Sequence, residues 1–252
     1  MSDSNSSRQG VQVISRAASI LRTLERHTQG LSLGAIAKET GLARSTVQRI
    51  IYALETEGFV IAASPGGRVR LGPGLVSLGS AAKADIDRVI LPHMKRLSEE
   101  VEETVDLSVQ DGDMMIFIDQ VTAQTQRLRA VSAVGNAFPI GRCANGKAVL
   151  ANLPKEQAIQ LLSLPGDQQS TGRPMQPLLD ELESIRASGV AFDREEHLEG
   201  ICAVGAAVDD PYGRNIALSI PVPAVRFYKN EERLAKKLLQ YCTIIEAALG
   251  RS

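Results

Sequence analysis

The chain has 252 residues, of which 44% are hydrophobic and 23% charged, and this balance is typical of a globular protein with a buried core. No apolar run approaches the length of a membrane span, and residues 1–10 lack the apolar stretch of a signal peptide. The three cysteines are far apart and odd in number, which argues against a disulfide framework or a Cys-based zinc site and fits a reducing cytoplasm. At this length two domains are the default expectation.

Charge is divided unevenly along the chain. Residues 1–80 hold nine Lys/Arg against five Asp/Glu, a balance of +4, and the remainder holds 19 against 24, a balance of −5. A basic N-terminal region joined to an acidic region favours phosphate binding at one end only. Because +4 is modest for DNA binding, two copies in a dimer would double the phosphate contacts, and affinity would fall steeply with salt.

In chain order, the first predicted element is a helix that Ser15 caps. Its apolar positions are Ile14, Ala17, Ala18, Leu21 and Leu24. Their spacing indicates one buried face that packs behind the elements that follow. Residues 1–10 are expected to be a disordered tail, and residues 11–72 to form the first domain.

Two short helices joined by a tight turn are predicted over residues 32–58. Ser32 can cap the first helix, because its hydroxyl accepts a hydrogen bond from a first-turn amide, and Gly41 can end that helix in the left-handed conformation. The apolar period then restarts at Val47, Ile50, Ile51 and Leu54. Two helices around such a turn are typical of a helix-turn-helix.

The other side of the second helix is cationic and amide-bearing. Its polar residues are Arg44, Ser45, Thr46, Gln48 and Arg49. Arg and Gln match base edges in the major groove, and Ser and Thr contact phosphates or bases. No acidic residue occurs between Gly41 and Leu54, whereas a solvated helix face usually mixes both signs. The pattern favours DNA binding over the alternative, a polar surface helix of an all-α domain.

Two short extended runs follow, at residues 59–62 and 68–71, with a turn signal at residues 64–67 between them. A hairpin directly after the second helix predicts a winged helix-turn-helix. Arg68 and Arg70 alternate on one hairpin face, where they either reach phosphates or a minor groove, or are solvated arginines.

The break Gly72-Pro73-Gly74 marks a domain boundary, and a linker helix is predicted within residues 73–86. Leu75, Val76 and Leu78 would give this helix an exposed apolar stripe, which favours self-association. A dimer is also what two major-groove contacts one turn apart require.

The second domain is expected to span residues 87–252. Strands are predicted over residues 104–110, 114–121, 128–134, 201–208 and 215–221. Helices are predicted over residues 145–152, 155–163, 175–188 and 231–249. Strands interrupted by helices, with hairpin turns at both ends, predict an α+β domain with a mostly antiparallel sheet.

Three blocks of sequence in this order resemble the IclR family of bacterial transcriptional regulators. They are LSLGAIAKETGLARSTVQRIIYALETEGFV, CANGKAVLANLP and VAFDREEHLEGICAVGAAVDDPYGRNIALSIPVP. The resemblance covers residues 11–250 and implies a winged helix-turn-helix, a linker helix and a GAF/profilin-like effector-binding domain. It also implies a homodimer, often a dimer of dimers, that responds to a small organic acid or aromatic metabolite.

The middle block fits G-x-x-x-x-G-K at residues 141–147 but continues with Ala148. A P-loop needs a Ser or Thr hydroxyl there to hold Mg²⁺, so ATP or GTP hydrolysis is not expected. No cofactor is assigned. A Gly-containing turn that leads into a helix still points amides outward at the positive end of the helix dipole, which suits a carboxylate. The alternative is an ordinary loop–helix junction.

The resemblance places the effector at the start of this helix, near the residue at position 193 and on the two strands that follow. The expected contacts are Phe138, Ile140, Cys143, Ala144, Asn145, Gly146, Asp193, Cys202, Ala203 and Ser219. The family often has Cys where this chain has Ala203, and can have Ser where it has Pro221. Fewer hydroxyls beside apolar Phe138 and Ile140 suggest an acid larger or more apolar than glyoxylate.

Asp193, Glu195, Glu196 and His197 could bind a metal, and some family members hold one, but three acids and a His more often form a solvated turn. No metal site is therefore assigned.

Two other functions compete with DNA binding. A hydrolase would use Cys143 or Ser219 as nucleophile with His197 as base, and an adaptor would bind protein through the helix-turn-helix. G-x-S-x-G is absent, and an enzyme would leave the N-terminal domain unexplained. The sequence predicts a cytoplasmic, ligand-responsive regulator that binds double-stranded operator DNA, more often a repressor of a catabolic pathway, and no enzyme.

Overall fold

A computed structural model describes residues 3–62, 67–84, 86–123, 126, 128–130, 132–164 and 174–250, with the backbone alone at residues 3–11 and 87. The chain divides into two compact units, residues 1–84 and 85–252, and each is described by itself. Within the described ranges, no helix is long and apolar enough to cross a membrane.

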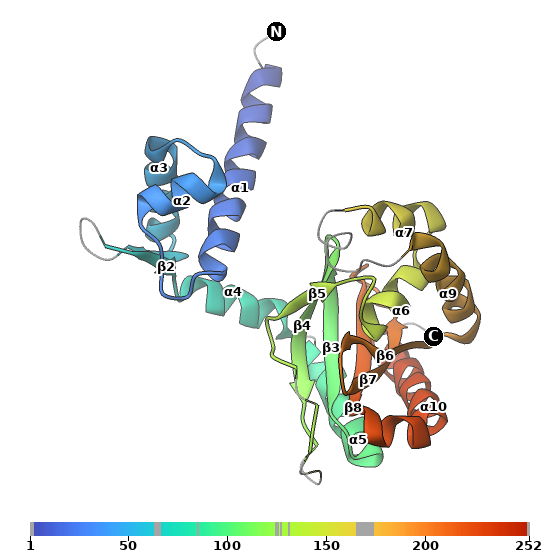
Figure 1. Cartoon of the computed structure of the whole chain (residues 1–252). Helices are drawn as coiled ribbons and strands as arrows, with labels where there is room; N and C mark the ends of the chain where they lie inside the picture. The colour runs from blue at the N-terminus through green and yellow to red at the C-terminus, as the bar shows by residue number, and fades with distance from the viewer. Residues whose placement is uncertain are drawn as a thin grey trace. The chain divides into compact units, whose positions relative to one another are not determined.

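The N-terminal unit is a winged helix-turn-helix (Figure 1). Its elements are α1 (Asp3–Glu25), α2 (Leu33–Thr40), α3 (Arg44–Thr56), β1 (Val60–Ala62), β2 (Val69–Leu71) and α4 (Gly74–Ala82). β1 and β2 pair antiparallel, with Ile61 opposite Arg70. The expected wing turn falls largely on residues 63–66, which lie outside the described residues. α4 lies inside the range expected for the linker.

The helix-turn-helix forms for the local reasons that the sequence indicates. The Ser32 hydroxyl accepts a hydrogen bond of 3.2 Å from the amide of Ala35, which caps α2. Gly41 and Gly58 adopt left-handed backbone angles, with φ of 67° and 71°, and so end α2 and α3 where a side chain would be strained.

The first helix differs from its prediction. α1 begins at Asp3, inside the segment expected as a tail, because a helix that is already packed extends at little cost per residue where no proline interrupts it. Ser15 is therefore an interior residue and not a cap. Ile20 and Leu24 face the core, whereas Ile14 is 72% exposed. The buried face of α1 therefore includes Ile20, whereas the predicted face included Ile14.

The C-terminal unit is an α+β domain, as the sequence predicts. Its elements are η1 (Ile86–Ile90), α5 (Leu91–Val101), β3 (Val105–Asp111), β4 (Met114–Val121), β5 (Ala137–Pro139), α6 (Ala144–Asn152), α7 (Lys155–Leu162), α9 (Met175–Ser188), β6 (Ala191–Leu198), β7 (Ile201–Val208), β8 (Ile216–Pro223) and α10 (Ala224–Ala248). The sheet has the order β5-β4-β3-β8-β7-β6, and every neighbouring pair is antiparallel.

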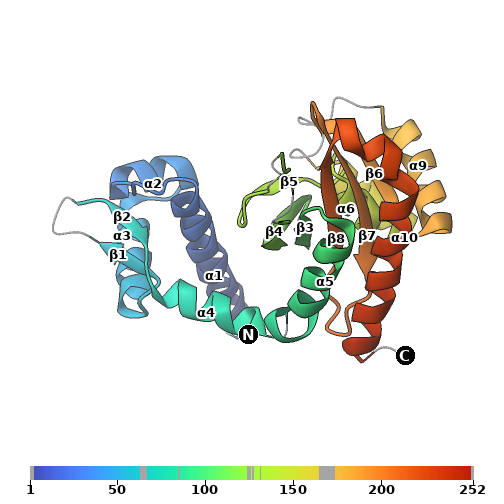
Figure 2. The same ribbon diagram turned by 90° about the horizontal axis from the view of Figure 1, so that it is seen from below.

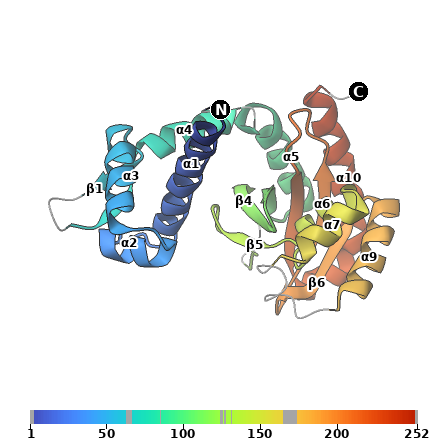
Figure 3. The same ribbon diagram turned by 90° about the horizontal axis from the view of Figure 1, so that it is seen from above.

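Each face of this sheet packs on its own layer of helices (Figures 2 and 3). On one face Leu97 of α5 and Leu238 of α10 pack against Val204 and Leu218. On the other face Leu150 of α6 and Leu182 of α9 pack against Ala191 and Ala217. Alternate residues of one strand therefore belong to different cores.

Two strands differ from prediction. No strand forms at 128–130 or 132–134, the described part of the strand expected over 128–134, and Leu128 and Val134 are 61% and 59% exposed. The alternating residues there pair with no strand among the described residues, and the strand that pairs with β4 on this side is β5. The sequence does not predict β6, because its charged DREEH run resembles a turn. β6 is an edge strand, and charged side chains on an edge strand commonly protect a sheet against aggregation.

Candidate DNA-binding surface and effector site

Helix α3 presents a one-sided polar face. The residues Arg44, Ser45, Gln48 and Arg49 are exposed, and Thr46 is half-buried at the flank. Among the residues that the structure describes, none forms an ion pair with either arginine. Both guanidinium groups are therefore available to an anion. The helix is held by Val47, Ile50, Ile51 and Leu54, which lie in the core.

A groove of about 970 Å³ runs beside this face. It is lined by Ser32, Leu33 and Gly34 of the α2 start, by Arg44, Ser45, Gln48, Arg49, Ile51, Tyr52 and Glu55 of α3, and by Ala62, Gly67 and Val69 of the wing. The Glu55 carboxylate accepts a hydrogen bond of 3.1 Å from the amide of Ala62. The groove's acidic side chain thus fastens the wing to α3.

The two wing arginines do not line this groove. Val69, which lies between them in sequence, faces the core, so Arg68 and Arg70 point to the opposite side of the hairpin. Arg68 donates to the carbonyl of Gly30 at 3.4 Å. A Cβ at Gly30 would lie 2.7 Å from Cγ of Arg70, so both arginines pack beside the α1–α2 loop while remaining exposed.

In the C-terminal unit, helix α6 begins directly on the sheet. A Cβ at Gly205 of β7 would lie 2.5 Å from the carbonyl carbon of Ala144 and 2.6 Å from the nitrogen of Asn145, so glycine is required for this contact. Gly205 is paired with Ser219, and Ser219 with Asp106. Ala203 lies two residues before Gly205 on the same face of β7 and is paired with Asp193 of β6.

The two edges of the sheet meet near the start of α6. β5 and β6 are opposite edge strands, yet the rings of Phe138 and His197 are 4.3 Å apart between centroids. Phe117 of β4 continues the aromatic wall, 5.1 Å from Phe138. Arg142 also donates to the carbonyl of Glu196 at 3.0 Å. The sheet thus curls around the start of α6, so that Phe117, Phe138 and His197 form an aromatic cluster where its two edges meet.

A bulge in β6 shapes one side of the site. Glu195 has a φ of 64°, and the register shifts after Arg194. Oδ1 of Asp193 accepts from the amides of Glu196 (2.8 Å) and His197 (3.4 Å). Burial raises the pKa of the Asp193 carboxyl to about 6, and the nearby Glu196 carboxylate also raises it, against these hydrogen bonds.

The His197 ring has a buried polar atom, Nδ1, without a hydrogen-bond partner among the described residues. Burial lowers the pKa of His197, and the Arg142 guanidinium lowers it further, so the ring is neutral at pH 7. A neutral imidazole has one donor and one acceptor, and a buried group left without a partner costs about 1–3 kcal/mol. A ligand that supplied the partner would recover this cost.

Buried polar groups form the floor of the site. Asn145 donates to Ser108 Oγ at 2.6 Å, and Ser108 donates to the carbonyl of Ala217. The Asp106 carboxyl is 1% exposed and accepts from Gln120 Nε2 and Ser132 Oγ, both at 2.6 Å. Burial raises the pKa of Asp106 to about 6, although these two hydrogen bonds lower it.

The structure brings most of the predicted effector residues together. Phe138, Ala144, Asn145, Asp193, Ala203 and Ser219 lie around the site. Cys202 does not: it lies in the core between the sheet and α10, because its neighbour Ala203 takes the α6 face. Ile140 and Gly146 serve packing, since a Cβ at Gly146 would lie 2.1 Å from the carbonyl oxygen of Ile140.

Four residues of the site were missed by the sequence interpretation, namely Gly205, Asp106, Phe117 and, as an effector contact, His197. A glycine inside a strand pattern is a known sign of close backbone approach and could have indicated Gly205. Nothing in the local pattern distinguishes Asp106 or Phe117 from other strand residues.

The acidic cluster of β6 is engaged in separate contacts. Glu196 forms an ion pair with Lys147 at 2.8 Å, and Glu195 accepts from the amide of Gly200. In the described ranges, no three His, Cys, Asp or Glu side chains are grouped to hold a metal ion. Burial raises the pKa of the Cys143 thiol to about 12, so a thiolate nucleophile is not formed at neutral pH.

Sequence comparison decides the family. Residues 13–61 match the IclR helix-turn-helix domain, and residues 79–246 match the C-terminal domain of the bacterial transcriptional regulator IclR. The chain belongs to the IclR family. It is 47% identical to the HTH-type transcriptional regulator Rv1719 of Mycobacterium tuberculosis, over 94% of this chain and 92% of the relative. It is 42% identical to TtgV of Pseudomonas putida, over 96% and 93%.

Solved structures of IclR regulators share the fold. The IclR regulator of Alicyclobacillus acidocaldarius aligns with a TM-score of 0.78 at 25% identity, over 95% of this chain and 99% of the other. An IclR homologue of Microbacterium hydrocarbonoxydans, solved with 4-hydroxybenzoate, aligns at 0.73 and 20% identity, over 94% and 98%. The matched family and the two sequence relatives are transcriptional regulators, so the chain is a transcriptional regulator with a helix-turn-helix and an effector-binding domain, and not an enzyme.

Proposed function

We propose that this IclR regulator is a repressor of a catabolic pathway that binds a double-stranded operator through α3 and is released by a small organic or aromatic acid. The observation that carries the DNA-binding part is the exposed face of α3, where Arg44 and Arg49 are free of described ion-pair partners. Such guanidinium groups match guanine edges or phosphates. Arg68 and Arg70 would add phosphate contacts from the wing, on the side away from the α3 groove.

The effector part rests on the chemistry of the site. Phe117 and Phe138 offer apolar ring faces and edges, which suit an aromatic ring. The first amides of α6 lie at the positive end of the helix dipole, which favours a carboxylate by about 0.3–2 kcal/mol. The neutral His197 ring would bond to a hydroxyl or carbonyl at the far end of the ligand. An aromatic acid that carries a hydroxyl would suit the phenylalanine rings, the α6 amides and the His197 ring together.

Dimerisation would allow two α3 helices to occupy successive major grooves. Val76 and Leu78 of α4 are 70% and 55% exposed, and Val13 and Ile14 of α1 are 51% and 72% exposed. Apolar side chains that gather on exposed helices mark association surfaces. We infer a homodimer, with a dimer of dimers as the larger assembly, that acts in the cytoplasm. A bound dimer represses if its operator overlaps the promoter.

Fluorescence anisotropy with duplex DNA from the region upstream of the gene tests this proposal. The wild type should bind at 50 mM salt, lose affinity steeply towards 200 mM, and be released by a hydroxylated aromatic acid. Arg44→Ala/Arg49→Ala should abolish specific binding, whereas the exposed control Lys155→Met in the other unit should not. Equal affinity for all duplexes would refute operator recognition by α3. No release by any of the acids tested would refute the proposed effector class.

A further inference from the structure

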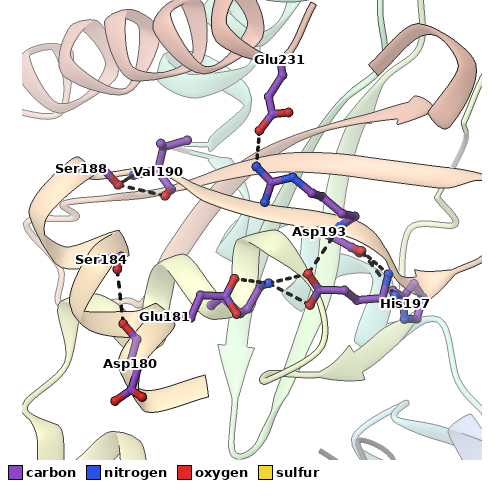
Figure 4. Close-up of polar contacts among 11 residues, drawn as sticks. Asp180, Glu181, Ser184, Ser188, Val190, Asp193, His197 and Glu231 are labelled. Atoms are coloured by element: carbon purple, nitrogen blue, oxygen red, sulfur yellow. Dashed lines mark hydrogen bonds and ion pairs between the residues drawn. The ribbon is translucent and has the colours of Figure 1, made fainter. Parts of the chain in front are cut away.

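Lys147 is a fully buried cation one turn into α6. Its side chain is 0% exposed. Its Nζ donates to Glu196 Oε1 and Oε2 of β6, at 3.0 and 2.8 Å, and to Glu181 Oε1 of α9, at 2.6 Å. The contacts around Glu181 are drawn in Figure 4. A buried charge that loses its partners is strongly destabilising. α6, α9 and β6 therefore cannot separate at this point without exposing the ammonium group.

Glu196 connects this ion pair to the effector site. Its amide donates to Oδ1 of Asp193 at 2.8 Å, and its carbonyl accepts from Arg142 at 3.0 Å. The next residue, His197, lies against Phe138, and Figure 4 shows Asp193 and His197 close together on this segment. The position of Glu196 thus sets where the Asp193 carboxyl and the His197 ring stand relative to the start of α6.

Stability alone does not explain why the pair is buried. Replacing both members of a buried ion pair by apolar side chains is often neutral or stabilising, because the desolvation cost of two charges disappears with them. A buried pair does fix a geometry, since its strength depends on short, directed contacts. This pair lies one helical turn from the first residues of α6 and one residue from His197.

We propose that Lys147 is a positioning residue of the effector site: by holding Glu196, it keeps the β6 bulge, with Asp193 and His197, in a fixed place relative to the start of α6. The inference rests on the proposed function, in that an effector binds beside Phe138, Asp193 and His197. Lys147 itself does not touch the effector, because its ammonium group is surrounded by the two carboxylates.

The test replaces the ammonium group and its more buried carboxylate together, as Lys147→Met/Glu196→Leu in the full chain; the remaining partner, Glu181, is 33% exposed and can be solvated. The matched control is Lys155→Met/Glu183→Leu, which makes the same exchange in a pair 4.0 Å apart with side chains 58% and 55% exposed; it also removes the surface pair of Glu183 with Arg186, and exposed pairs of this kind contribute little to stability. Three quantities are measured: the melting temperature, amide hydrogen exchange over residues 193–198, and calorimetric affinity for benzoate, 4-hydroxybenzoate and phenol.

The paired variant should melt close to the wild type, whereas the backbone amides of residues 196 and 197 exchange faster and the affinity for the best-bound probe falls roughly ten-fold. The control should change none of these. Wild-type exchange and affinity in the paired variant would overturn the proposal.

If the wild type binds no probe, the proposed effector class fails, and the exchange rates still decide the role of Lys147. Should the paired variant not fold, Glu196→Leu alone is used; it removes the contact between residue 196 and Lys147 and leaves Glu181 to pair with the ammonium group. Wild-type exchange and affinity in this variant would likewise overturn the proposal.

Discussion

Replacing Asp106 with Asn should stabilise the protein at alkaline pH. The carboxyl is 1% exposed, and burial raises its pKa from 3.8 to about 6. A group whose pKa is raised in the folded state contributes stability below its unfolded pKa and loses that contribution as pH rises through the folded pKa. A shift of about two units corresponds to roughly 3 kcal/mol that is lost by pH 8.

Asn at this position carries no charge, and its amide can still accept from Gln120 and donate to Ser132. We therefore expect the variant to exceed the wild type by about 1–3 kcal/mol at pH 8. For a unit of this size that is several degrees in melting temperature. The difference should shrink steadily as pH falls from 7 to 5, because Asp106 itself becomes protonated.

Melting curves of the full chain at half-unit steps from pH 5 to pH 8 measure this difference. The matched control is Asp180→Asn, since the exposed Asp180 carboxylate also accepts from a glutamine amide, at 2.8 Å from Gln176. The control should show no pH-dependent gain. A destabilised Asp106→Asn variant at pH 8, or a gain that is constant with pH, would show that burial does not penalise this carboxylate.

Three further predictions concern the two sites. Arg49→Ala should cost roughly 1–3 kcal/mol of operator affinity and relax the preference at one base pair if Arg49 reads a base; an equal loss on every duplex would make it a phosphate contact. Gly205→Ala should destabilise the C-terminal unit by about 1–3 kcal/mol, because the new Cβ would overlap Ala144, and a wild-type melting temperature would contradict the close approach of α6. Affinity for an aromatic acid should rise as pH falls from 8 to 6, because the pKa of Asp193 is about 6 and a carboxylate ligand binds better once Asp193 is protonated. Calorimetry that finds no pH dependence would place the ligand carboxylate away from Asp193.

The helix-turn-helix could be predicted from the sequence because its determinants are local. A capping hydroxyl at Ser32, left-handed glycines at positions 41 and 58 and an apolar period of 3.6 residues each act within one or two turns. The buried face of α1 is harder to predict, because two possible apolar faces share Ala17, Leu21 and Leu24. Contacts with the rest of the unit decide whether Ile14 or Ile20 is buried.

The effector site could be predicted only in part because its decisive features are non-local. Period-2 alternation shows that Cys202 and Ala203 face opposite ways, but only the packing of α6 and α10 decides which of them meets the site. The contact of Phe138 with His197 depends on the curl of the whole sheet. The pairing of Lys147 with Glu181 and Glu196 likewise joins α6 to α9 and β6, across 34 and 49 residues of sequence.

The salt dependence of binding to the upstream duplex tests the account most directly, with Arg44→Ala/Arg49→Ala beside the wild type. The account predicts that log affinity falls linearly with log salt concentration for the wild type, and that the variant has both a weaker affinity and a shallower slope. Identical slopes for the two proteins, or no binding by the wild type at low salt, would contradict the assignment of the α3 face to DNA.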